Sequence, residues 1–167
     1  LTGNQIVYKV MEEILQQYEK KPRPQGKEVF TDLGKGLPPV LFDKFQLGFV
    51  LRNLLENAFS KVNPECPLQF STRFSREEGA GGPADFVDLI LWYNSREGAL
   101  RAFSKVAGLE AGPDFQNLNM ALLLIRRVMV RNQGKMQVLQ EDDGGMTVRL
   151  QFPAGNRREG ALRESHA

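Results

Sequence analysis

The stretch Asn53–Lys61, NLLENAFSK, lies inside an apolar helical repeat and carries two carboxamides one turn apart. Asp43 can cap this helix, which we expect to run to about Val62, because apolar residues recur along one side: Leu47, Leu51, Leu54, Ala58 and Val62. At 3.6 residues per turn, Asn53, Asn57 and Ser60 share one edge, with Lys61 nearby. Such an edge could hold Mg²⁺ by an amide oxygen and a phosphate by an ammonium group. The alternative is a solvated face opposite the leucines, which periodicity alone favours.

The segments on both sides of this helix show the periods of further helices and of strands. Apolar stripes predict helices at 4–20 and 118–132. Alternation predicts strands at 27–33, 68–75, 85–94, 135–141 and 146–153, and the turns GAGGP (79–83) and DDGG (142–145) predict two hairpins. We therefore expect an α/β two-layer sandwich, a mixed and mostly antiparallel sheet covered on one face by helices. Residues 1–153 would form one domain and 154–167 a flexible tail.

Composition narrows the classes of function. The formal charge of the 167 residues is only +2, and the basic residues do not alternate with aromatic ones, which argues against nucleic-acid binding. No apolar run approaches the roughly 20 residues of a membrane span, so we expect a soluble fragment without membrane contact. Because the chain starts at Leu1, we expect it to come from a longer protein. Cys66 has no second cysteine for a disulfide.

Two longer segments carry a resemblance to a known family. LPPVLFDKFQLGFVLRNLLENAFSK (37–61) and MALLLIRRVMVRNQGKMQVLQEDDGGMTVRLQFP (120–153) resemble, in order and spacing, the catalytic, ATP-binding domain of sensor histidine kinases. The likeness covers about residues 4–153. It implies the Bergerat-type ATPase fold, ATP and Mg²⁺ as ligands, and a cytoplasmic place in a bacterial two-component system. It also implies an upstream dimerisation domain with the phosphoacceptor histidine, a homodimeric parent protein and a response regulator as a candidate partner.

The first of the family's nucleotide motifs is largely present. By this resemblance Asn57 matches the Asn that ligates Mg²⁺, and Asn53 matches the polar residue one turn before it. Lys61 lies one position later than the usual phosphate-contacting basic residue, where this chain has Ser60. The resemblance therefore implies a metal and phosphate edge on this helix.

The other two motifs depart from the family. The Asp that binds the adenine amino group falls on Tyr93, or on Asn94 if the register slips by one, and a Tyr ring there would fill the adenine pocket. Counting back from RNQG (131–134), which matches the family's His-Gly-Gly turn, the two phosphate-loop glycines fall on Asn119 and Ala121. A Cβ at either position obstructs a backbone approach to phosphate.

These departures predict a degenerate pseudokinase domain that acts by docking within a larger sensor. The alternative is an active, divergent ATP:protein-histidine phosphotransferase with an unorthodox lid at about 96–117. A third reading, an anti-sigma-type serine kinase, fits the leading helix less well. We expect no catalytic residue in this chain, because its one histidine, His166, lies in the tail. We also expect the lid to be the least protected part of the domain apart from the tail.

Overall fold

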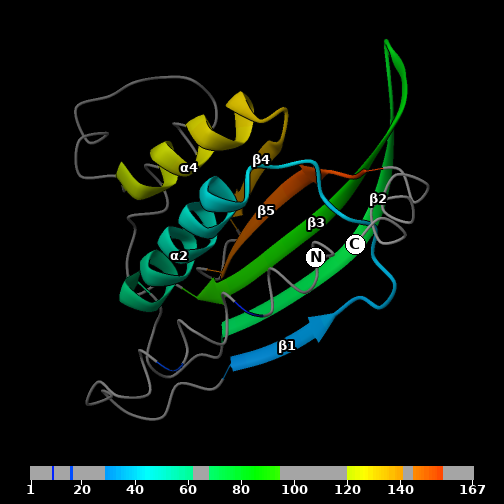
Figure 1. Ribbon diagram of the computed structural model, residues 1–167. Coiled ribbons are helices and arrows are strands. Elements are labelled where there is room, and N and C mark those ends of the chain that lie inside the picture. Colours follow the sequence, from blue (N-terminus) through cyan, green and yellow to red (C-terminus); the bar gives the residue numbers. More distant parts are fainter. Residues whose placement is uncertain are drawn as a thin grey trace, which may run out of the picture.

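The computed structural model describes residues 29–61, 68–94, 120–140 and 145–155, together with Lys9 and Gln16, and its described elements form one sheet and a helix layer (Figure 1). The strands are β1 (Val29–Leu33), β2 (Leu68–Gly79), β3 (Gly82–Asn94), β4 (Lys135–Gln140) and β5 (Gly145–Pro153). The helices are α2 (Lys44–Lys61) and α4 (Met120–Arg131). Both helices lie on the same face of the sheet (Figure 1). The predicted two-layer architecture is confirmed.

The sheet is mixed and open, with strand order β1-β2-β3-β5-β4. β1 is parallel to β2, and the other three neighbouring pairs are antiparallel. Both predicted hairpins are therefore confirmed. β2 and β3 continue past the predicted 68–75 and 85–94 up to the turn at Ala80 and Gly81, and their tip projects beyond the helix layer (Figure 1).

The core lies between the sheet and the two helices. It takes alternate residues of β2, β3 and β5, since successive side chains of a strand point to opposite faces. These strand residues are Leu68, Phe70, Leu89, Leu91, Tyr93, Met146, Val148, Leu150 and Phe152. The buried stripe of α2 meets them with the predicted Leu47, Leu51, Leu54 and Ala58, and α4 adds Leu122, Ile125 and Met129.

The start of α2 is set by Asp43, as the sequence predicts. The Oδ1 atom of Asp43 accepts hydrogen bonds from the backbone N–H groups of Phe45 at 3.0 Å and Gln46 at 2.9 Å. These are two of the N–H groups that a helix N-terminus leaves without an intrahelical partner. The cap fixes the register of α2, and with it the edge that carries Asn53 and Asn57.

Several predictions fall on residues outside the described part of the chain. Of the predicted helix 4–20, only Lys9 and Gln16 are described, and both are helical. Cys66, the lid at 96–117, Asn119 and His166 are not described. Backbone hydrogen bonds continue past the predicted domain end at 153: Ala154 N–H donates to Asp85 and Gly155 N–H to Pro39.

The end of α4 is made by Gln133 and not by the glycine that follows it. Gln133 has φ +60°, the left-handed conformation that usually selects glycine after a helix. The N–H of Gly134 donates to the carbonyl of Met129 at 2.8 Å and the N–H of Gln133 to that of Val130 at 3.1 Å. Gly134 is needed for a different reason: a Cβ there would lie 2.9 Å from the carbonyl oxygen of Gln151.

Replacing Gln133 with glycine should therefore stabilise the protein by about 0.5–1 kcal/mol. A side chain in the left-handed region costs about 1–2 kcal/mol, and part of the gain from removing it is offset because glycine loses more conformational entropy on folding. Urea unfolding of Gln133→Gly would measure the gain. The matched control is Gln137→Gly in the exposed edge strand β4, which should destabilise. A loss of stability in Gln133→Gly would contradict the assigned cap.

The sheet face opposite the helices carries a network of charged and polar side chains around Asp88, which is 0% exposed. Asp88 is paired in register with Arg73 on β2 and Gln151 on β5. Its Oδ2 accepts from Arg149 Nε at 2.9 Å, Arg149 Nη2 at 2.7 Å and Arg73 Nε at 3.4 Å; its Oδ1 accepts from Ser75 Oγ at 2.7 Å and Gln151 Nε2 at 3.3 Å. These bonds join β2, β3 and β5 across the face opposite α2 and α4.

The network extends to the edge strand β4. Gln151 Nε2 donates to Glu77 Oε1 at 2.8 Å, and Lys135 Nζ reaches Glu77 Oε2 at 2.5 Å. These two donors hold the pKa of the Glu77 carboxyl below its usual range, with Lys135 the larger cause. The ammonium of Lys135 also lies 5.0 Å from the centroid of the Phe86 ring. Four strands are thus tied together on this face by side chains as well as by backbone bonds.

Candidate functional site

The polar edge of α2 faces α4. Gln46, in the first turn of α2, accepts a hydrogen bond at its Oε1 from Asn132 Nδ2 at 2.5 Å, just beyond the end of α4. On the helical wheel Asn53 and Asn57 lie within about 20° of Gln46. Asn57 is buried, with 6% of its surface exposed. The solvated-face alternative is therefore wrong for Asn57, although half-buried Asn53 donates its Nδ2 to the carbonyl of Phe49 at 2.7 Å.

The Gln46–Asn132 contact joins the first turn of α2 to the end of α4. α2 and α4 run antiparallel (Figure 1), and both rise about 1.5 Å per residue. Equal numbers of residues forward from Gln46 and back from Asn132 lead to Asn57 and Ala121. These two sequence-predicted site positions therefore lie equally far along their helices from that contact, one on each helix of the layer.

Tyr93 lies at the end of β3, on the helix side of the sheet, and is 1% exposed. Its hydroxyl donates to the sulfur of Met146 at 3.7 Å, and the two residues are paired in register between β3 and β5. Burial raises the pKa of the Tyr93 hydroxyl. Where the resemblance puts an exposed carboxylate acceptor, this chain thus has a neutral phenol packed into the core beside a thioether.

Met146, the residue against which Tyr93 packs, was not singled out by the sequence. It is 1% exposed and is the first core residue of β5. The sequence shows the strand DFVDLILWYN and the closing hairpin, which could have suggested that the two pair. Identifying Met146 as the partner of Tyr93 also requires the register between these strands, which are far apart in the sequence.

The remaining predicted site residues are described in part or not at all. Lys61 and Asn94 are the last residues of α2 and β3, and the structure describes their backbones but not their side chains. Ala121 is half-buried in the first turn of α4. Among the described residues, no group of three or more His, Cys, Asp or Glu side chains could hold a metal ion. Nor is any helix in the described ranges long and apolar enough to cross a bilayer.

Comparison with known proteins gives a result at the level of fold. No family model and no curated protein matches the chain. Among solved structures, the nucleotide-free catalytic domain of histidine kinase ThkA matches with a TM-score of 0.67 at 14% identity, over 92% of this chain and 93% of that one. The mycobacterial sensor histidine kinase MprB matches with a TM-score of 0.63 at 14% identity, over 92% and 95% of the two chains.

A longer structure aligns over one part of its length. Full-length ShkA in complex with AMPPNP matches with a TM-score of 0.65 at 18% identity, over 93% of this chain and 31% of that chain. The alignments cover nearly the whole of this chain in each case. The chain therefore has the HATPase-type fold of the catalytic domains of sensor histidine kinases.

Proposed function

We propose that this chain is the catalytic-type domain of a sensor histidine kinase whose nucleotide pocket has degenerated, so that it acts by docking within a larger signalling protein. The observation that carries the proposal is the burial of Tyr93 against Met146 where an adenine-binding carboxylate is expected. Arrangement in a homodimeric parent, with an upstream dimerisation domain and a response regulator as partners, belongs to the same proposal.

The predicted nucleotide site would suit ATP on one side only. A nucleotide with Mg²⁺ would need an amide oxygen on α2, for which Asn57 is suitably placed on the edge facing α4. It would also need an acceptor for the adenine amino group, and Tyr93 does not fit that role because its ring is packed in the core. Losing a hydrogen bond to a charged acceptor costs about 1.5–3 kcal/mol, which weakens binding by roughly 10- to 150-fold.

The position of Ala121 weakens the phosphate side as well. In the first turn of a helix, backbone N–H groups bind anions when nothing obstructs their approach. Ala121 brings a Cβ to the first turn of α4, where glycine would leave the backbone bare. Both the adenine end and the phosphate end of a nucleotide would therefore lose a contact that the family makes. Without bound ATP the domain cannot support phosphoryl transfer.

The second candidate is an active, divergent ATP:protein-histidine phosphotransferase. The placement of Asn57 favours it, because a buried amide on the edge facing α4 is what a Mg²⁺–phosphate site would use. In that case the lid at 96–117 and Lys61 would supply the contacts that Tyr93 and Ala121 do not.

Thermal unfolding with Mg²⁺–ATP separates the two candidates. A ligand at a hundredfold excess over its Kd stabilises the folded state by about 2.7 kcal/mol, which would raise the melting temperature by several degrees. We expect millimolar Mg²⁺–ATP to raise it by about 1 °C or less, equally in the wild type and in Asn57→Ala. A larger, saturable rise that Asn57→Ala abolishes would instead establish the active enzyme.

A further inference from the structure

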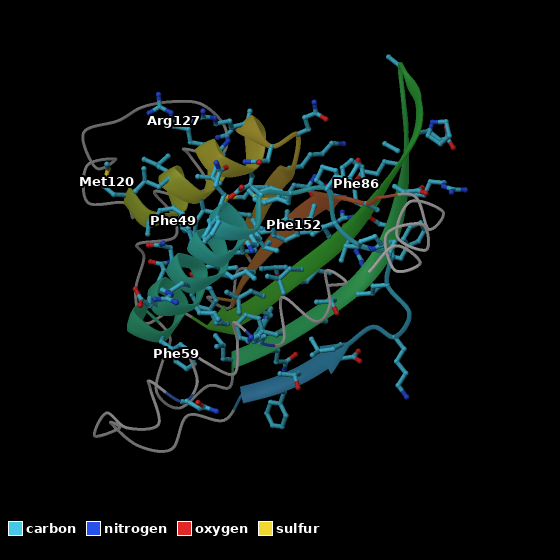
Figure 2. All side chains as sticks on the ribbon, viewed as in Figure 1. Phe49, Phe59, Phe86, Met120, Arg127 and Phe152 are labelled. Carbon is cyan, nitrogen blue, oxygen red and sulfur yellow. The ribbon has the colours of Figure 1, made fainter. Side chains whose placement is uncertain are left out.

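α2 and α4 each present the same sequence of side chains on the side away from the sheet. Two apolar residues and an arginine follow at spacings of four and three: Phe45, Phe49 and Arg52 on α2, and Met120, Leu124 and Arg127 on α4. On each helix these three lie within about 60° of one another. Figure 2 shows Met120 and Arg127 on the side of α4 that points away from the sheet. We call these six residues, with Arg131, the basic–apolar face.

The apolar side chains of this face are unusually exposed. Phe45 is 78% exposed, Met120 62%, Leu124 44% and Phe49 43%. Isolated exposed apolar residues are common on proteins, but a group on two adjacent helices marks a contact surface. Within the described residues they are not part of the core, since the buried stripes of both helices point to the sheet.

The charge of the face is one-sided. Arg52, Arg127 and Arg131 are all exposed, and the one acidic residue between them in the described helices is Glu56. A second copy of the chain would bring like charges together, which argues against a homodimer through this face. The complementary partner is an anionic surface with an apolar interior.

We propose that the basic–apolar face binds the surface of an anionic lipid bilayer, with the phenylalanines, Met120 and Leu124 at the acyl boundary and the arginines among the headgroups. A deformable bilayer accommodates exposed side chains from two helices without the matched pockets that a protein partner would need. Amphipathic helices bind membranes in this way, with apolar burial and attraction to anionic lipids adding.

This inference revises the expectation of no membrane contact, which rested on the absence of a spanning segment. Surface binding needs no such segment. It is independent of the proposed function, because the face contains none of the residues of the nucleotide site and requires no nucleotide. Failure of either proposal leaves the other standing.

Sedimentation with vesicles tests the proposal. The chain should bind vesicles of equimolar phosphatidylcholine and phosphatidylglycerol, bind vesicles of phosphatidylcholine alone much more weakly, and be released from the anionic vesicles as ionic strength rises from about 0.05 to 0.5 M. Arg127→Glu should weaken binding at least about fivefold, since each cation near an anionic surface contributes about that factor. Lys35→Glu, an equal charge change at an exposed loop residue, should have a smaller effect.

A second pair of variants tests the apolar side chains of the basic–apolar face. Phe45→Ser with Phe49→Ser should lower binding at least tenfold, whereas Phe30→Ser with Leu139→Ser, which removes similarly exposed apolar residues from the sheet edges, should not. The charge comparison decides alone if a serine variant fails to fold. No binding to anionic vesicles at low salt, equal loss in Arg127→Glu and Lys35→Glu, or capture of this face by a helix of the parent protein without vesicle binding would overturn the proposal.

Discussion

Replacing Asp88 with alanine should destabilise the protein by about 3–5 kcal/mol, the usual cost of breaking a buried ion pair by removing one partner. Asp88 is 0% exposed and accepts hydrogen bonds from Arg73, Ser75, Arg149 and Gln151. Its loss would leave the guanidinium of Arg149, 22% exposed, with Glu77 at 3.8 Å as its remaining acidic neighbour among the described residues. For a chain of this size the melting temperature should fall by about 10 °C.

The matched control lies three residues earlier on the same strand. Asp85 forms two hydrogen bonds with Arg76, at 2.6 and 3.0 Å, but both side chains are exposed at the projecting end of the hairpin. Asp85→Ala should therefore change the melting temperature far less than Asp88→Ala, because water and salt screen an exposed pair. Equal effects of the two substitutions would show that the network around Asp88 does not hold together the sheet face opposite α2 and α4.

Replacing Tyr93 with alanine is expected to cost about 3–5 kcal/mol, the range for removing a buried aromatic side chain and leaving a cavity. Tyr93 belongs to the main core cluster, packed between β3 and the helices, and is among its largest fully buried side chains. Tyr93→Phe keeps the ring and loses only the weak hydrogen bond to the Met146 sulfur, so it should cost less than about 1 kcal/mol. Denaturant unfolding of both variants measures the difference.

The stability of the Tyr93 variants also tests whether the Tyr93 ring fills the predicted adenine site. If Tyr93→Ala were nearly neutral, the ring would not be a core residue and the site beneath it would be open to a ligand. Restoring the family's residue with Tyr93→Asp should be costlier still than alanine, since the carboxylate would be buried beside Met146. The change that would rebuild an adenine contact is thus one that the present core does not tolerate.

The helices and hairpins of this fold were predictable because each buries one side. The stripe from Leu47 to Ala58 and the Asp43 cap are local patterns, and the structure confirms both. The ends of β2 and β3 at the turn were not predictable. The projecting part of the hairpin runs through the polar sequence REEG (76–79), which lacks the alternation of a half-buried strand. The parallel pairing of β1 with β2 depends on a non-local contact that no local pattern encodes.

The candidate site was predictable to a different degree for each residue. The burial of Asn57 could not be decided from spacing, because an amide at that angle faces either water or a neighbouring helix. The structure places α4 there, as the contact of Gln46 with Asn132 shows. The substitution at Tyr93 was visible in the sequence, but its packing against Met146 required the register of β3 and β5. Asp88 gave no signal, since a single charged residue in a strand usually marks a solvated face.

Calorimetric titration of Mg²⁺–ATP into the purified chain is the most direct test of the central claim, that Tyr93 and Ala121 have closed a nucleotide pocket whose α2 edge survives. The histidine kinase ThkA catalytic domain, which shares the fold, supplies the comparison under the same conditions. We predict no saturable heat at ATP concentrations up to about 1 mM, which corresponds to a binding free energy weaker than about −4.1 kcal/mol. A saturable isotherm with a micromolar Kd, lost in Asn57→Ala, would contradict the account.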